Sequence, residues 1–432
     1  MVLILDPERK EDRASNPGIK LNGNTTDSIL YSSSPRKMSL CGYALQIRFF
    51  VILCVGLSIL GIIIGSHCSN RYCSKSDLQT NRIANASEDS RSLVNSLGLS
   101  SDDPLLNLFD VANVNFEIRG NDVMVFLHIQ KTGGTQFGRH LVKDLDLERP
   151  CACEHERKRC DCLRPGKNRE IWLFSRFSVG WKCGLHADWT ELTECVDRKL
   201  NQVVGKRSKR RYYYVTFLRD PLSRFLSEFR HVQRGATWKN SKHSCDRRSP
   251  TEIELPRCYD GERWTNVTLE NFMSCPYNLA INRQTRMLAD LKLVGCYNMS
   301  AMSKTQRDRI VLASAKLNLS NMPFLGLTEK QQMSQYIFER TFKMKFLVPF
   351  EQHNVTVSSQ TLKLISEREK KMVLELNNLD VELYEYALKL FNYRFSKLKS
   401  LDTDFEAHYQ NIISSNGQNF TWDSLYDEDA DA

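Results

Sequence analysis

Apolar runs alternate with helically spaced apolar residues along the middle of the chain, and this pattern predicts strands alternating with helices. Val123–Ile129 is a continuous apolar run, as expected of a strand buried on both faces, whereas Gly134–Leu145 has helical spacing. Tyr212–Leu218 is a second run of the β type. Asp220 and Pro221 follow it, and they suit the cap and the first turn of another helix.

The pattern continues towards the C-terminus and indicates a fold class. It predicts helices over Leu279–Leu291, Arg307–Leu319 and Gln332–Phe342, a short strand over Phe324–Leu327, and one long helix or a broken pair over Leu362–Phe391. Strands that alternate with helices favour an α/β domain with a largely parallel sheet flanked by helices.

An uncharged segment near the N-terminus predicts a membrane anchor. Phe49–Gly65 is an apolar run, and the uncharged stretch continues to Asn70, close to the roughly 20 residues that a spanning helix needs. A cleaved signal peptide is disfavoured because the run begins far into the chain and lacks a clear small-x-small exit. Polar sequence on both sides disfavours a buried core helix. We therefore expect one transmembrane helix.

This anchor divides the chain into expected regions. Residues 1–48 would be a cytosolic tail, 49–70 the transmembrane signal-anchor, 71–104 a polar stem, 105–395 a lumenal domain, and 396–432 an acidic C-terminal tail. Lysine and arginine counts on the two sides of the anchor are balanced and do not set its orientation. The N-x-S/T sequons favour a lumenal body, because Asn24 precedes the span and the others follow it: Asn85, Asn266, Asn298, Asn318, Asn354 and Asn419.

The cysteines agree with a lumenal body. The chain has 14, and the even group between Cys151 and Cys296 could pair entirely in an oxidising compartment. A zinc site is the alternative for the tight group Cys151, Cys153, Cys160 and Cys162. Both of its pairs enclose one residue instead of the usual two to four, so we expect disulfides, with a connectivity that the sequence does not reveal.

Charge is unevenly distributed in this chain of 432 residues, of which 41% are hydrophobic and sufficient for a large core. The formal net charge is +9, although the last ten residues are acidic. Basic residues gather in two clusters: Arg157, Lys158, Arg159, Arg164, Lys167 and Arg169, and then Lys206, Arg207, Lys209, Arg210 and Arg211. Each cluster is either a solvated basic face or a site for a polyanion.

Two strand–turn–helix junctions carry groups that suit anions. At the first, the sequence KTGGT offers an ammonium, two hydroxyls and backbone N–H groups at a helix N-terminus. At the second, Arg219 ends a strand, and Ser223 and Ser227 lie on one face of the next helix. Parallel strands would bring both junctions to one pocket, where a nucleotide with two separate phosphate groups could bind. In KTGGT the lysine precedes the glycines, so this is not a Walker A loop, which disfavours an ATP-dependent kinase.

Four longer blocks resemble one enzyme family. The blocks FLHIQKTGGT, LFSRFSVGWKCGLHADWTEL, LRDPLSRFLSEFRHVQRGATW and CPYNLAINRQTRMLADLKLVGCYN resemble heparan-sulfate 6-O-sulfotransferases, from about Val123 to Tyr393. The resemblance implies an α/β fold with a P-loop-like parallel sheet (the sulfotransferase fold). It also implies transfer of a sulfuryl group from 3′-phosphoadenosine 5′-phosphosulfate to the 6-hydroxyl of glucosamine in heparan sulfate. It further implies a single-pass type II protein of the Golgi membrane, with no metal requirement and no nucleic-acid partner.

The resemblance also assigns roles to residues. His186 would be the general base, and Lys131, together with the amides of Gly133 and Gly134, would stabilise the leaving phosphate oxygen. Arg219 and Ser227 would bind the 3′-phosphate. The full donor-binding set is His128, Ile129, Gln130, Lys131, Thr132, Gly133, Gly134, Thr135, Gln136, Arg219, Ser227, Glu351, Gln352 and His353. The acceptor-binding set is Lys158, Arg159, Arg176, Trp181, His186, His231 and Trp238.

The chain departs from the family pattern in two places, and two other functions stay open. Asn354–Ser358 is uncharged where family members have a basic residue, and Gln136 stands where they have threonine. A lumenal phosphotransferase would use the same geometry, but with a divalent metal and ATP. A non-catalytic heparin-binding membrane protein would bind the glycan without transferring sulfate.

Overall fold

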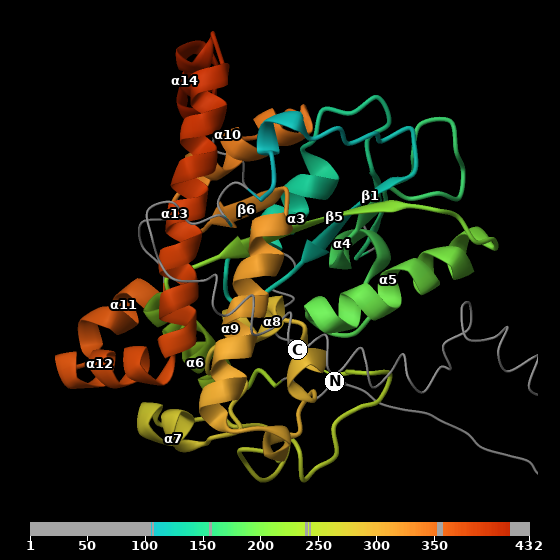
Figure 1. Cartoon of the computed structure of the whole chain (residues 1–432). Coiled ribbons are helices and arrows are strands. Elements are labelled where there is room, and N and C mark those ends of the chain that lie inside the picture. Colours follow the sequence, from blue (N-terminus) through green and yellow to red (C-terminus); the bar gives the residue numbers. More distant parts are fainter. Residues whose placement is uncertain are drawn as a thin grey trace, which may run out of the picture. The chain divides into compact units, whose positions relative to one another are not determined.

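Four parallel strands form the central sheet of the protein. The computed structural model describes residue 105 and residues 108–154, 158–237, 241, 243–351 and 357–414, without the side chains of 357–359. The sheet has the order β4 (Leu173–Phe174), β1 (Asp122–Leu127), β5 (Arg211–Leu218) and β6 (Phe324–Leu327), and all neighbours are parallel (Figure 1). Every residue of β1 and β6 is buried. The three strands expected from apolar runs are therefore confirmed, whereas the two residues of β4 are too few for a pattern to reveal.

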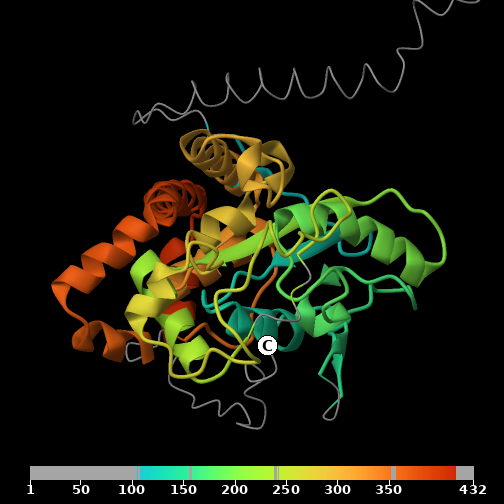
Figure 2. The same cartoon turned by 90° about the horizontal axis from the view of Figure 1, so that it is seen from below.

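Helices cover both faces of this sheet. Figure 2 shows α3 on one face, and α5 and α9 on the other. The helices are α3 (Gly134–Lys143), α4 (Arg176–Val179), α5 (Trp189–Val204), α6 (Pro221–Gln233), α7 (Leu269–Ser274), α8 (Arg283–Leu288), α9 (Lys304–Asn321), α10 (Gln331–Phe342), α11 (Val357–Leu364), α12 (Glu367–Leu376), α13 (Asn378–Leu401) and α14 (Phe405–Ser414). Short 3₁₀ turns, η3 (Val111–Asn113), η4 (Leu291–Val294) and η5 (Met299–Ala301), and a hairpin of β2 (Ala152–Cys153) and β3 (Cys160–Asp161) complete the described elements.

Two expected helices differ from the structure. The range Leu279–Leu291 contains only the short α8, because Asn282 adopts a left-handed conformation and α8 begins after it. The range Leu362–Phe391 spans parts of three helices, α11, α12 and α13. Ser366 caps α12 and Asn377 separates α12 from α13, so local hydrogen bonds interrupt an apolar pattern that continues through both breaks.

The order of the strands fixes where a ligand would bind. The chain leaves β1 through α3 towards β4 on one side, and later leaves β5 through α6 to α9 towards β6 on the other. Leu127 and Thr216 are paired in register, so the segments that follow β1 and β5 lie at the same edge of the sheet. Ligands of open parallel sheets bind at such a reversal of connection direction.

The described residues share one main hydrophobic core and one satellite. The main core surrounds the sheet, and a second cluster of buried residues, including Phe225 and Phe272, packs α6 against α7 and α12. Leu398, Phe405 and Ile412 belong to the main core, so the packed domain continues beyond residue 395, where an acidic tail was expected to start. The membrane anchor expected over 49–70 lies outside the described residues, and none of the described helices is long and apolar enough to span a bilayer.

Five disulfides use every cysteine of the group between Cys151 and Cys296. The pairs are Cys151–Cys162, Cys153–Cys160, Cys183–Cys195, Cys245–Cys296 and Cys258–Cys275. The tight group that could have suggested zinc forms two nested links in the β2–β3 hairpin region, so the disulfide prediction is confirmed.

Candidate active site

The turn after β1, which contains Lys131 and Gly133, has an unusual backbone conformation. Lys131 has φ 65° and Gly133 has φ 75°, so two of its residues adopt the left-handed conformation, which is costly for lysine. Gly134 begins α3 and is buried. A Cβ added at Gly134 would lie 2.3 Å from Cδ2 of His128, so only glycine fits between the helix and that ring.

This turn offers an anion site at the start of α3. The first N–H groups of a helix have no partner within the helix, and those of α3 open at the carboxyl edge of the sheet. The Thr132 hydroxyl donates to the Ile129 carbonyl at 3.0 Å, and the Thr328 hydroxyl donates to the Thr132 carbonyl at 2.8 Å. The chain after β6 therefore holds the turn in place.

Arg219 joins the second junction to the first. Its Nη1 donates to the Lys131 carbonyl at 3.3 Å, so the guanidinium lies beside the turn after β1. The buried Gln284 side chain accepts from the backbone N–H of Arg219 at 2.9 Å and donates to its carbonyl at 3.0 Å. Burial lowers the pKa of Arg219, while the charges of Glu329 and Asp220 act in the opposite direction. Arg219 is thus held at both ends, by Gln284 at its backbone and by the Lys131 carbonyl at its guanidinium.

A buried network of ion pairs lies next to the residues that hold Arg219. Glu228 on α6 accepts from Arg224 Nη1 at 2.5 Å and from Arg283 Nε at 2.8 Å. Burial alone would raise the pKa of Glu228, but the charges of Arg283 and Arg224 outweigh it and lower the pKa to about 2. Asp380 of α13 accepts from the backbone N–H of Gln284 at 3.2 Å. The network therefore connects α6, α8 and α13 to the residue that holds Arg219.

His186 lies in a strained loop beside the same turn. It has φ 50°, a left-handed conformation that is uncommon for histidine, and its side chain is buried. Its Nδ1 is 3.2 Å from the His128 carbonyl oxygen, and the two rings are 4.8 Å apart. A carbonyl oxygen only accepts, so Nδ1 carries a proton in this contact and the neutral ring keeps its lone pair on Nε2.

His128 forms the wall between the turn and His186. Its ring stacks on Phe126 at 5.3 Å and lies 6.3 Å from the ring of Trp181. Burial lowers the pKa of His128 well below its ordinary value, and the charges of His186, Arg176 and Lys131 lower it further. His128 is therefore neutral. Its buried Nδ1 has no hydrogen-bond partner within the described part of the chain.

Cationic and aromatic side chains also lie next to His186. The Trp181 ring is 4.6 Å from the His186 ring, and the Arg176 guanidinium carbon lies 5.3 Å from the Trp181 ring centre. Arg159 donates to the Val179 carbonyl at 3.4 Å and lies over Gly180. These side chains come from two separate segments, the one before β3 and the one that contains α4, and together they form a surface suited to an anionic sugar chain.

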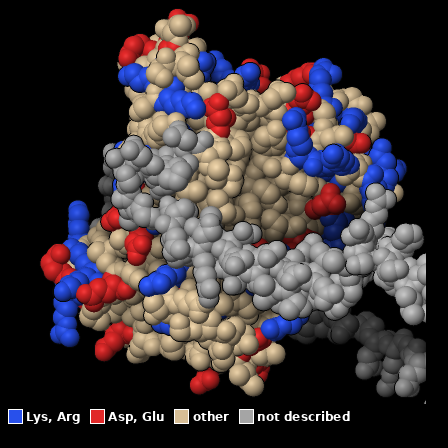
Figure 3. All heavy atoms as spheres, viewed as in Figure 1, with Lys and Arg blue, Asp and Glu red and all other residues tan. Residues whose placement is uncertain are grey.

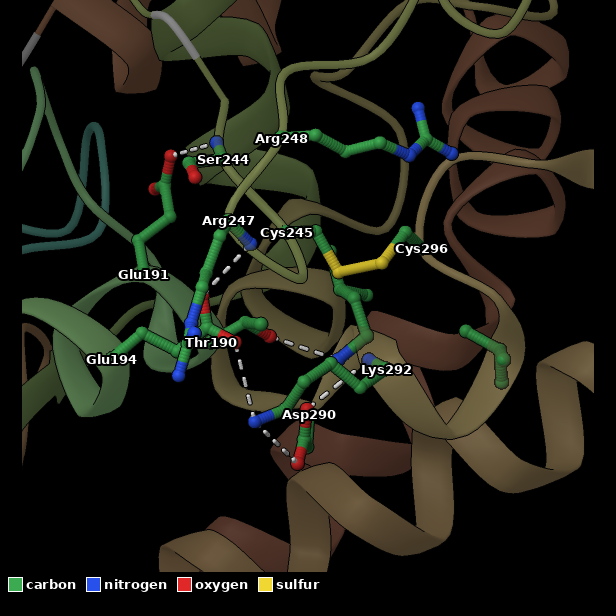
Figure 4. Close-up of a disulfide and its surroundings, with 12 residues drawn as sticks. Thr190, Glu191, Glu194, Ser244, Cys245, Arg247, Arg248, Asp290, Lys292 and Cys296 are labelled. Atoms are coloured by element: carbon green, nitrogen blue, oxygen red, sulfur yellow. Dashed lines mark hydrogen bonds and ion pairs between the residues drawn. A yellow bond between two sulfur atoms is a disulfide. The ribbon is translucent and has the colours of Figure 1, made fainter. Parts of the chain in front are cut away.

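A disulfide and a buried capping box hold the His186 loop. Cys183 bonds to Cys195 of α5, and Asp188 caps α5 in a reciprocal box with Glu191. Glu191 Oε1 also accepts from the Ser244 N–H at 2.7 Å, next to the Cys245–Cys296 disulfide that closes the following loop (Figure 4). Burial raises the pKa of Asp188 well above its ordinary value, and the charge of Glu191 raises it further. The loop therefore rests on buried, interlinked groups.

Some of the other expected site residues are described in the structure, and some lie outside the described residues. Ser227 is half-buried on α6, two turns beyond its start, and Glu351 is half-buried at the end of its described segment. Lys158 is exposed next to Arg159, and His231 is buried on α6. Gln352, His353, Trp238 and the uncharged segment 354–356 lie outside the described residues. The remaining donor-set residues, Ile129, Gln130, Thr135 and Gln136, belong to the turn and the first turn of α3.

Three supporting residues escaped the sequence reasoning. Gln284 lies in one of the four quoted blocks, but nothing in its spacing indicated a contact with Arg219. Thr328 follows β6, and its position directly after a strand at the ligand edge was an available signal. Glu191 stands three residues after Asp188, a spacing that a capping box requires.

Comparison with known proteins gives matches over most of the described domain. The sequence model of the sulfotransferase family matches residues 114–387. Heparan-sulfate 6-O-sulfotransferase 3 of Homo sapiens is 58% identical over 292 residues, which are 67% of this chain and 61% of that protein. The type 2 protein of Gallus gallus is 58% identical over 288 residues (66% and 71%), and the type 1 protein of Cricetulus griseus is 56% identical over 292 residues (67% and 72%). The matched part of the chain thus spans less than two thirds of the human relative.

Proposed function

The chain belongs to the sulfotransferase family and, within it, to the heparan-sulfate 6-O-sulfotransferases, and from this premise we propose its reaction. It transfers a sulfuryl group from 3′-phosphoadenosine 5′-phosphosulfate to the 6-hydroxyl of glucosamine residues in heparan sulfate. The observation that supports this most directly is the hydrogen bond from Arg219 to the Lys131 carbonyl. It joins two anion-binding junctions at one edge of the sheet, as a donor with two separate anionic groups requires.

The residues present fit such a donor. The N-terminal amides of α3 and the Lys131 ammonium suit the 5′-phosphosulfate, and Arg219 with Ser227 suits the 3′-phosphate. Gly134 keeps the approach to the turn open, since a Cβ there would collide with His128. When bound, the donor supplies the sulfuryl group and a phosphate leaving group. Lys131 and the turn amides stabilise the negative charge that develops on that leaving oxygen.

His186 acts as the general base. A sugar hydroxyl is a weak nucleophile, so its proton must be removed as its oxygen attacks sulfur in line. Because the His128 carbonyl holds Nδ1–H, Nε2 of His186 is the nitrogen that accepts this proton. The left-handed backbone of His186 and the Cys183–Cys195 link fix the direction of the ring. His128 stays neutral and adds no proton of its own to the acceptor pocket.

The acceptor binds over Trp181 and the surrounding cations. Arg176 lies against the Trp181 ring, so a sugar stacked on the open side of the indole would meet a guanidinium beside it. Arg159 and Lys158 extend the positive surface, and His231 contributes from α6. Trp238 stays in the acceptor set on the evidence of the sequence alone. We place the reaction in the Golgi lumen, with the chain anchored by its segment 49–70.

Transfer to defined acceptors tests the reaction. The full-length protein is incubated with radiolabelled sulfate donor and either 6-O-desulfated heparin or heparan sulfate, and the products are mapped as disaccharides. We expect label on the 6-hydroxyl of glucosamine without added divalent metal. Label at N, 2-O or 3-O positions would refute the regiochemistry. Transfer from ATP that depends on metal would favour a phosphotransferase, and glycan binding without any transfer would favour a non-catalytic protein.

Substitutions test the assigned roles. His186→Ala should lower kcat by about 10²–10⁴-fold, the usual contribution of a positioned general base. His408→Ala is the matched control, because it removes a half-exposed histidine from α14. Near-normal turnover of the His186→Ala protein would refute His186 as the base.

A further inference from the structure

Four exposed cations form what we name the distal basic patch: Arg198, Lys206, Arg207 and Lys209. They come from the last turns of α5 and the turn that leads into β5. No aspartate or glutamate occurs from residue 198 to residue 211. Figure 3 shows basic side chains gathered on the side of the molecule where α5 ends and β5 begins. This is the amino edge of β5, opposite the edge that carries the candidate active site.

The nearby carboxylates leave most of this charge uncompensated. Asp197 is occupied by Arg210 Nη1 at 3.2 Å, by the Asn201 amide at 2.8 Å and by the Tyr212 hydroxyl at 2.5 Å. Glu170 lies 4.0 Å from Lys206 and is also bound by Lys167 at 2.9 Å. Within the described part of the chain, Arg198, Arg207 and Lys209 have no ion pair. The patch is therefore a surface with surplus positive charge.

The patch is concave and polar. It borders a hollow of about 880 Å³, whose other walls include Asn201, Gln202 and Ser208. Amides and hydroxyls between cations offer hydrogen bonds to the hydroxyl and sulfate oxygens of a sugar chain. The lining contains no aromatic side chain on which nucleic-acid bases could stack, and no apolar side chain that could anchor a membrane.

Helix α5 connects this hollow to the candidate active site. Asp188, its N-cap, is two residues from His186, and Gly205, its C-cap, lines the hollow, so the helix spans about 25 Å at 1.5 Å per residue. Cys195, midway along it, is bonded to Cys183, which directly follows the exposed Lys182. Arg198 and Gln202 follow on the same face at intervals of three and four residues.

We propose that the distal basic patch is a second binding site for the sulfated polysaccharide, which holds a part of the acceptor chain remote from the reacting sugar. The inference rests on the proposed function, because that function makes a long polyanion the acceptor. A chain that leaves the Trp181 surface past Lys182 meets Arg198 next and then the hollow. Long acceptors therefore bind at two places along α5, whereas oligosaccharides shorter than about 25 Å occupy only the reaction centre.

The test compares long and short acceptors. The variant carries Arg198→Ala, Arg207→Ala and Lys209→Ala in the full-length protein. The control variant removes the same number of exposed charges elsewhere, with Lys304→Ala, Arg309→Ala and Lys371→Ala on α9 and α12. The measurements are kcat and KM for full-length N-sulfated chains and for oligosaccharides of graded length. Direct binding of the same glycans at several salt concentrations is measured separately.

The patch variant should raise KM for long chains about tenfold at low salt, from three surface contacts of modest strength, with kcat unchanged. KM for the shortest acceptors should stay at the wild-type value, and the control variant should match the wild type throughout. Equal KM changes for long and short acceptors, or no change for either, would overturn the proposal. Binding of the patch variant to anionic vesicles and to acidic peptides is measured as well. The proposal would also be overturned if the patch substitutions weakened binding to either of these and left the affinity for long glycan chains unchanged.

The binding measurement separates this proposal from the reaction. If the wild type transfers no sulfate but loses long-chain affinity through the patch substitutions, the proposed function fails and the patch is still a glycan site. If sulfate is transferred and long-chain affinity does not depend on the patch, only the patch proposal fails.

Discussion

Replacing Gly134 by alanine should distort the candidate site through one defined collision. The added Cβ would lie 2.3 Å from Cδ2 of His128 and 3.0 Å from Phe126 Cζ, whereas ordinary contact begins at 3.4 Å. The His128 ring cannot easily move, because it stacks on Phe126 and packs against the rings of Trp181 and His186. The backbone of Gly134 has no positive φ, so the collision is the only cost. Overpacking of this kind costs about 1–3 kcal/mol.

A double-mutant cycle attributes this cost to the ring. The proteins are the wild type, Gly134→Ala, His128→Ala and the combination, and the free energy of unfolding is measured for each by urea titration. Removing the ring removes the closest collision and leaves only the 3.0 Å contact with Phe126 Cζ, so the alanine at 134 should cost much less in the His128→Ala background. The coupling energy should therefore be about 1–3 kcal/mol. The single Gly134→Ala protein should also show a raised KM for the sulfate donor, because the turn shifts.

Two results would refute this reasoning. If the effects of the two substitutions add within about 0.5 kcal/mol, the ring is not what excludes a side chain at residue 134. If Gly134→Ala leaves both stability and donor KM unchanged, the turn is not packed as described.

Three further predictions concern the groups around the site. Glu228→Gln should lower the free energy of unfolding by roughly 3 kcal/mol at neutral pH. The folded pKa of Glu228, about 2, lies below the ordinary 4.5, so this stability is present above pH 4.5 and is lost as the pH falls towards 2. Urea titrations in which the difference in free energy of unfolding between wild type and variant does not shrink over this pH range would contradict the prediction. Removing the Cys183–Cys195 link with a double serine variant should cost about 3 kcal/mol and lower kcat, measured by calorimetry and sulfate transfer; unchanged kcat would show that the link does not position the loop. Gln284→Leu should raise the donor KM about tenfold and leave the acceptor KM unchanged, because the backbone of Arg219 loses both partners; Gln284→Glu keeps one partner and should fall between, and equal changes in both KM values would argue against a donor-specific role.

The sequence predicted the sheet well because its strands carry strong local signals. Val123–Leu127 and Phe324–Leu327 are buried on both faces, and such strands read as continuous apolar runs. The cap and proline at Asp220 and Pro221 also act locally, and the structure confirms both. The breaks at Ser366 and Asn377 were not predicted because the helical spacing of apolar residues continues through both of them. Short-range hydrogen bonds determine where one helix ends and the next begins.

The candidate site was predictable only in part for a different reason. The KTGGT turn and Arg219 are visible because strand ends are visible, and parallel strands bring their ends together. The hydrogen bond between Gln284 and Arg219 joins residues far apart in sequence, and no sequence pattern indicates such a contact. Disulfide pairing has the same limit, because the spacing of cysteines allows many connectivities and packing selects one.

The positions of the disulfides divide the domain into two parts with different requirements for folding. None of the described cysteines lies in β1, β5 or β6, or in α3, α6, α9, α10 or α13, so the sheet, its main helices and the donor turn need no oxidation to pack. The cross-links lie instead in the segments that carry Arg159, His186 and the loop beyond Cys245. A chain made in a reducing compartment would thus form the sheet and the turn after β1 before the cross-linked segments are complete. Under the proposed function, formation of these cross-links would then complete the acceptor side and confine sulfate transfer to an oxidising compartment.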